Sequence, residues 1–446
     1  MQILRPLAHG PIARLWLGQS LATIGEQLYR IAYAWLLAGM IGSGTGFALA
    51  LECVAVLLVA LAAGGFAARC SPRGSMIGAD LARAALALLP IVATAGHRLS
   101  VPALLVPSVA LVAMRPLFDP ALQASLPCLA RDRQILVGAN ALMDATARIG
   151  RLVGPSVAGV LAAVLPTVGL MGVTSACFVA SALAVHSLDP RLAPTRADAG
   201  GTPWRALGQG WRAVRAQAGF WFFLCAGGVI NGLWSVAMWL ALPLALRQVP
   251  SHVAGRDGLA LVSFVVAAYG AGNLLSNLVT GSRCVQRPVR WIFSGQAVIA
   301  IGFILLGALS GHVTSRPAFV ALTAAAGLAG MGAPLSDIPM ATLRQSLFAR
   351  QDIASVFRLK MIFDWSGMLI ANLLAPLALR YAGASTLIVA CGTGIGLVPL
   401  IGVLAPRLRA ASVAWSVSAP RPLPRSREAA LPAVHALGHR PGPPSS

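Results

Sequence analysis

The chain has 446 residues, of which 57% are hydrophobic and 11% are charged, and its mean hydropathy is +0.77. A soluble domain carries about 25% charged residues, so this composition excludes an ordinary water-soluble protein and favours a membrane protein with many spans. The formal net charge of +21 would indicate a nucleic-acid partner in a soluble chain. Here the positions of the basic residues favour a lipid bilayer instead.

A transmembrane helix needs about 20 mainly apolar residues to cross roughly 30 Å of hydrocarbon. The hydropathy pattern predicts about twelve such spans and therefore an all-α polytopic membrane protein. The predicted spans are 15–38, 46–67, 76–95, 100–118, 142–163, 167–187, 219–245, 259–280, 291–310, 317–336, 361–380 and 384–404.

Basic residues concentrate in the tails and in the loops that follow even-numbered spans. These loops contain Arg69, Arg73 and Arg83, then Arg131 and Arg133, then Arg283, Arg287 and Arg290, and then Arg344, Arg350, Arg358 and Lys360. The opposite loops contain only Arg98, Arg247, Arg256, Arg316 and Arg380. Cytoplasmic loops carry the excess of Lys and Arg, so we expect both termini in the cytoplasm.

The longest loop divides the predicted spans into two sets of six. We interpret 188–218 as a cytoplasmic linker, because it is charged and rich in Pro and Gly, between an N-terminal half at 1–187 and a C-terminal half at 219–405. The tail at 406–446 is rich in Pro, Arg and Ser and is predicted to be disordered.

No pattern indicates an enzyme, a metal site or a cofactor. The seven cysteines are scattered, without a C-x-x-C pair or a nearby His cluster, so we expect neither structural disulfides nor bound zinc. Nucleophile motifs and a sizeable soluble domain are also missing from the pattern. No cleavable signal peptide is evident, and the first apolar stretch is expected to remain as a span.

The two halves carry a short internal repeat. Pro116-Leu-Phe-Asp-Pro120 ends span four and Pro334-Leu-Ser-Asp337 ends span ten, and each is followed by an L-x-x-S-L stretch. The equivalent positions favour duplication with parallel halves, which is an architecture of transporters.

The segment Gly64 to Met76, GGFAARCSPRGSM, resembles the loop motif of the major facilitator superfamily. The resemblance is to the branch that contains enterobactin exporters and macrolide efflux proteins. It implies a gating loop of Gly64, Gly65, Arg69 and Arg73, with Asp119 as the partner acid. The motif's own Asp is replaced by Ala68, and plain positive-inside arginines are the alternative interpretation.

Three further segments carry the resemblance over nearly the whole first half. ADLARAAL, residues 79–86, and FDPALQASLP followed by ANAL, within 118–142, are similar to the branch's signatures. The GxxxGPxxGG motif of exporting members is matched at Gly150, Gly154, Pro155 and Gly159. This sequence departs from the motif only at Ala158. Small residues at this spacing also serve generic helix packing.

Charges inside the spans are the remaining functional signal, because a charge in hydrocarbon is costly. Glu26 lies roughly 15 Å into the first span at 1.5 Å per residue, and it is the first candidate to carry a coupling proton. Arg30 is one turn away, so a static Glu26–Arg30 pair is the alternative. Glu52 and Asp144 are further proton-coupling candidates.

Residues that could bind a substrate come from three spans. They are Arg30, Arg148, Asn231, Trp234 and Trp239. Arg148 follows Asp144 by one turn, so an Asp144–Arg148 salt bridge competes with a role in binding an anion.

The resemblance implies a major facilitator fold with two six-helix halves around a central cavity. It implies a secondary transporter that exports a small amphipathic compound, coupled to protons, from a bacterial cytoplasmic membrane. A siderophore is placed ahead of a macrolide-like drug, and the chain is expected to act as a monomer without a cofactor. The alternatives are an inward or lysolipid transporter of the same fold, and a membrane sensor or enzyme.

Overall fold

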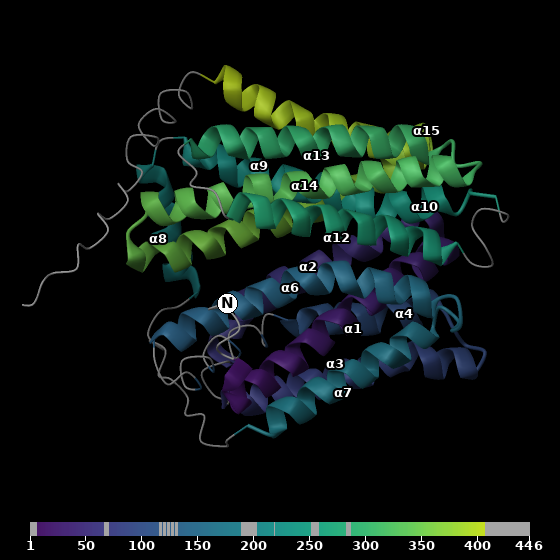
Figure 1. The fold of residues 1–446 in the computed structure, drawn as a ribbon, viewed down its shortest axis with the longest axis horizontal. Helices are drawn as coiled ribbons and strands as arrows, with labels where there is room; N and C mark the ends of the chain where they lie inside the picture. Colours follow the sequence, from purple (N-terminus) through teal and green to yellow (C-terminus); the bar gives the residue numbers. More distant parts are fainter. Residues whose placement is uncertain are drawn as a thin grey trace, which may run out of the picture.

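A computed structural model gives the fold of this chain, and Figure 1 shows its helices in two groups. The structure describes residues 7–66, 71–115, 118, 122, 125, 129, 133–188, 203–217, 219–250, 258–281 and 287–405. In these residues every regular element is helical, and no strand occurs among them. The predicted all-α class is therefore confirmed.

The first group is built from the N-terminal part of the chain. It contains α1 (Gly10–Ile41), α2 (Thr45–Phe66), α3 (Pro72–Ala95), α4 (Val101–Ala113), α6 (Arg133–Leu161) and α7 (Gly169–His186). In this group α1 packs between α6 and α7, and α3 lies against α4 and α7. A short 3-10 turn, η2 (Gly42–Gly44), joins α1 to α2.

The second group is built from the C-terminal part of the chain. It contains α9 (Phe220–Ser235), the π-helical segment η3 (Val236–Ala241), α10 (Leu242–Leu246), α12 (Leu259–Gly281), α13 (Pro288–Ser310), α14 (Arg316–Leu347) and α15 (Arg350–Leu404). The run called α15 is interrupted at Gly383, whose φ of 73° is outside the helical region. This break separates the predicted spans 361–380 and 384–404.

Eight helical stretches in the described part of the chain are long and apolar enough to cross a membrane. Two of them, Gly10–Val59 and Ser355–Leu404, have 50 residues and each overlaps two predicted spans. The apolar helix α4 is shorter than these stretches. The chain is a multi-pass membrane protein, and the count of twelve spans stays a prediction.

Several helices extend beyond the apolar stretches that predicted them. Arg344 lies in α14, and Arg358 and Lys360 lie in α15. Arg83 lies within α3 and is only 2% exposed. The assignment of Arg83 to a basic loop is therefore wrong, because this arginine packs inside the first group rather than facing the cytoplasm.

The predicted linker contains a helix, α8 (Pro203–Ala216), which packs against α15. Gln209 Nε2 donates to Asp352 Oδ1 at 3.0 Å, and the Trp211 ring contacts Trp221 at 4.4 Å between centroids. Gly210 lies against the backbone of Ser355, where a Cβ would come within 2.6 Å of the Ser355 carbonyl oxygen. The linker helix is thus attached to the second group.

The two groups meet along two helix pairs, α6 with α12 and α2 with α15. A third contact joins the end of α1 to the end of α10. There the Arg247 guanidinium lies over the Trp35 ring, 4.0 Å from its centroid, and donates to the Trp35 carbonyl oxygen. Gly258, with a φ of 63°, lies close to the six-membered ring of the same indole.

Candidate functional site

A cavity lies between the two groups of helices and is lined by side chains from both. It contains about 1020 Å³ of empty space, including the part that is open to solvent. The first group contributes Glu26, Arg30, Glu52 and Arg115 and the tyrosines Tyr29 and Tyr33, and the second contributes Trp239, Met361 and Trp365. The lining is therefore aromatic with a few charges.

Trp239 reaches the cavity from a π-helical segment. Pro243 has no N–H, and its ring clashes with the carbonyl four residues earlier, which is that of Trp239. A wider π turn over Val236–Ala241 accommodates the proline. The Arg30 guanidinium lies 4.6 Å from the Trp239 ring centroid, so a cation–π contact crosses the cavity between the groups.

Arg30 has no ion-pair partner among the described side chains. The Arg30 side chain is half-buried and lines the cavity beside Trp239. The predicted Glu26–Arg30 alternative therefore does not describe this structure. Arg30 instead presents a positive charge to the cavity.

Glu52 lies on α2 and is 7% exposed. Its Oε1 accepts a hydrogen bond of 2.5 Å from the Ser108 hydroxyl on α4. No described arginine or lysine forms an ion pair with it. The cavity thus has one carboxylate that a hydroxyl holds in place and that attracts Arg30 without forming an ion pair with it.

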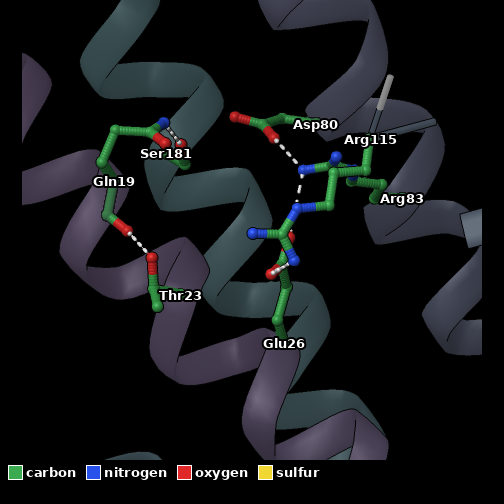
Figure 2. Close-up of polar contacts among 7 residues, drawn as sticks. All are labelled: Gln19, Thr23, Glu26, Asp80, Arg83, Arg115 and Ser181. Carbon is green, nitrogen blue, oxygen red and sulfur yellow. Dashed lines mark hydrogen bonds and ion pairs between the residues drawn. The ribbon is translucent and has the colours of Figure 1, made fainter. Parts of the chain in front are cut away.

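Glu26 belongs to a different arrangement, a four-residue ion cluster of Glu26, Asp80, Arg83 and Arg115 (Figure 2). Glu26 Oε1 lies 3.5 Å from Arg83 Nη1, and Glu26 Oε2 lies 3.3 Å from Arg115 Nη1. Asp80 Oδ1 lies 3.6 Å from Arg83 Nη1. Arg83 also lies over Phe118 and Phe178. Two acids and two bases balance in this cluster, which ties α1 to α3 and to the second residue after α4.

Two predicted substrate-binding residues lie beside the cavity rather than on its lining. Asn231 donates to the Gly227 carbonyl oxygen of its own helix at 2.9 Å. Trp234 packs edge-on against Trp239 and also contacts Tyr269, at 6.2 and 6.3 Å between centroids. Trp234 therefore supports the indole that faces the cavity.

Several predicted residues cannot be placed in the site from the described part of the chain. Ala68, Arg69 and Asp119 lie outside the described residues, and Gly64 and Gly65 end the helix α2. Arg73 donates a hydrogen bond to the His186 carbonyl oxygen at the end of α7. The side chains of Asp144 and Arg148 on α6 are likewise outside the described set.

The small-residue motif of α6 faces two neighbours. Gly150 and Gly154 pack against Thr23 and Gln27 of α1, within the first group. Gly159 faces α12 of the second group, where a Cβ would lie 3.2 Å from that of Ser263. One motif therefore serves both the interior of the first group and the interface between the groups.

Sequence reasoning missed Asp80, Arg83, Arg115 and Ser108 as site residues. Asp80 and Arg83 lie three positions apart inside the predicted span 76–95, and paired charges within a span are an available signal. Ser108 carries no such signal, because a serine in an apolar helix is common and its partner lies on another helix.

Comparison with known proteins gives a family and a fold. A family model described as "Transmembrane secretion effector" matches residues 2–333. A peptide transporter of the POT family in complex with alafosfalin is similar at a TM-score of 0.66 and 12% identity, covering 91% of this chain and 95% of that one. No curated protein sequence matches this chain.

Two further solved structures have the same fold. A POT family transporter in complex with a thioalcohol-conjugated peptide has a TM-score of 0.65 and 13% identity, covering 88% of this chain and 95% of that one. The nucleoside transporter NupG has a TM-score of 0.62 and 11% identity, with 92% and 99% covered. At these identities the likeness shows that the chain shares the fold of these transporters.

Proposed function

Because this chain belongs to the transmembrane secretion effector family of the major facilitator superfamily, we propose that it exports a small amphipathic compound across a bacterial cytoplasmic membrane, coupled to protons. The observation that carries the proposal is the cavity between the two helix groups, which combines aromatic walls with the unpaired Glu52 and Arg30. A siderophore is the first candidate substrate and a macrolide-like drug the second.

Alternating access follows from the placement of the cavity. Rocking of one group against the other exposes a site at their interface to each side in turn. The contacts α6–α12 and α2–α15 lie along this interface, and the Arg247–Trp35 contact closes one end of it. We place this closed end on the outer side, because Arg247 belongs to the loops with few basic residues.

We assign the coupling proton to Glu52 rather than to Glu26. A carrier has to exchange its proton in each cycle, and Glu26 is held between Arg83 and Arg115 in the ion cluster. Freeing Glu26 would break two ion pairs at once. Glu52 accepts a hydrogen bond from the Ser108 hydroxyl, forms no ion pair with a described side chain and lines the cavity directly.

Reconstituted protein tests this assignment. Proteoliposomes that contain the pH dye pyranine are offered a catecholate siderophore or a macrolide, and substrate-driven proton movement is recorded. Glu52→Gln should abolish proton movement and uphill transport while substrate–substrate exchange continues. Glu26→Gln is the matched variant and should keep coupled transport at reduced protein stability. Full coupling in Glu52→Gln would overturn the assignment.

Everted membrane vesicles test the direction. With an acidic interior generated by respiration, an exporter accumulates its substrate inside these vesicles. Accumulation only in right-side-out vesicles would instead identify an inward transporter of the same fold. Absence of any flux for the candidate compounds in both preparations would count against the export proposal for those compounds.

A further inference from the structure

We propose that the cavity recognises a zwitterion with an aromatic or bulky apolar body, whose anionic group binds Arg30 and whose cationic group binds Glu52. The inference rests on the proposed export function and narrows its substrate to amphipathic zwitterions, which excludes the singly charged macrolide-like drug. It is tested by binding alone, so its failure can be told apart from a failure to export.

The first step of the argument concerns the unpaired charges. Arg30 on α1 and Glu52 on α2 both line the cavity, and they attract each other without forming an ion pair with each other or with another described side chain. An unpaired charge at membrane depth is unfavourable by a few kcal/mol. A ligand that supplies both opposite charges relieves this cost at both residues.

The second step concerns net charge. Among the described side chains, two acids, Glu26 and Glu52, and two bases, Arg30 and Arg115, line the cavity. Their formal charges sum to zero, so a ligand with a net charge would leave an excess charge in a region of low dielectric constant. A dipolar ligand of zero net charge matches this lining.

The third step concerns the body of the ligand. Tyr29 and Tyr33 stack one turn apart on α1, with 6.1 Å between centroids and 12° between planes. Trp239, Met361 and Trp365 contribute the opposite wall from the second group. Both recognised charges belong to the first group and this wall to the second, so a bound ligand contacts both groups at once.

The test uses four probes that share one aromatic body, 3-(2-naphthyl)alanine. The amino acid is the zwitterion, its methyl ester is the cation, its N-acetyl derivative is the anion, and the N-acetyl methyl ester is neutral. Binding to the full-length protein in detergent is measured by equilibrium dialysis against matched empty micelles. The zwitterion should bind at least about tenfold more tightly than either singly charged probe, which is about 1.4 kcal/mol.

Two variants assign each charge to its residue. Arg30→Gln should lower the affinity for the zwitterion to that for the cation while leaving the affinity for the cation unchanged. Glu52→Gln should lower the affinity for the zwitterion to that for the anion and leave the affinity for the anion unchanged. Arg98→Gln, at an exposed arginine outside the cavity lining, is the control and should keep the wild-type order. Unchanged affinity for the neutral probe shows that each variant is folded.

Three results would overturn the proposal. They are an anion or cation that binds as tightly as the zwitterion, a preference for the zwitterion that survives both Arg30→Gln and Glu52→Gln, and the failure of all four probes to bind. If a variant does not fold, Arg30→Lys and Glu52→Asp take its place. Each keeps the charge and should keep the preference for the zwitterion.

Discussion

The guanidinium of Arg247 lies 4.0 Å from the ring centroid of Trp35 and donates a hydrogen bond to the carbonyl oxygen of the same residue. Gly39 provides the space, because a side chain there would collide with the guanidinium. One arginine from the second helix group is thus held on the last turns of α1. This contact closes the end of the cavity that we assign to the outer side.

Loss of this contact should open the outer end. A cation–π contact of an exposed arginine contributes about 0.5–1 kcal/mol, so Arg247→Gln should raise the ratio of outward-open to closed protein by up to about fivefold if the contact forms only in the closed state. Double electron–electron resonance between labels at Arg98→Cys and Arg316→Cys measures the opening. Arg380→Gln, another exposed arginine, is the control, and an unchanged distance distribution in Arg247→Gln would contradict the assignment.

Within the ion cluster, the two arginines should differ in their contribution to stability. The Arg83 side chain is 3% exposed and that of Arg115 is 54% exposed. Arg83→Gln should therefore destabilise the protein by about 3 kcal/mol, as for a buried pair, and Arg115→Gln by less than about 1 kcal/mol. Denaturant unfolding in detergent measures both, and an equal loss would show that Arg115 is shielded by lipid or by the rest of the chain.

The two ends of the α6 motif should respond differently to added bulk. Gly154→Val places a side chain against Gln27 and Ile24 of the same group, so it should lower the free energy of unfolding by about 1–3 kcal/mol. Gly159→Val faces Ser263 across the interface and should slow transport more than it lowers stability. Thermal unfolding and exchange rates separate the two effects, and Gly78→Val, at a glycine with open space around it, is the control.

The predicted topology can be read by reporter fusions. Fusions at Gly200 and Ser446 should both report a cytoplasmic position, because basic residues concentrate on that side. A fusion at Arg98 should report the opposite side. An external signal at Gly200 or Ser446 would require a different number of spans.

Hydropathy predicted the helices well because a span has to be apolar over its whole length. Each of the twelve predicted stretches overlaps a helix, and the predicted boundary between 361–380 and 384–404 coincides with the break at Gly383. The same signal could not reveal α8. Its polar face leaves the average hydropathy low, and its apolar side chains pack on α15 rather than on lipid.

The partners within the site were harder to predict, because they come from different helices. The spacing of Glu26 and Arg30 allows a pair along α1, but Glu26 turns to Arg83 and Arg115 while Arg30 turns to Trp239. The choice depends on how α1 is rotated against α3 and η3. Periodicity shows which residues share a helix face and does not show which neighbour that face meets.

The attachment of α8 to α15 bears on how the gene can be divided. Gln209, Gly210 and Trp211 all contact the second group, and Gln217 Nε2 donates to the Leu347 carbonyl oxygen at 3.2 Å. Two fragments expressed separately should therefore reassemble best when the cut falls in 189–202, so that α8 is synthesised with the helices it packs on. A cut after Gln217 would leave α8 on the fragment that lacks α15, and its apolar face would have to find α15 on another polypeptide.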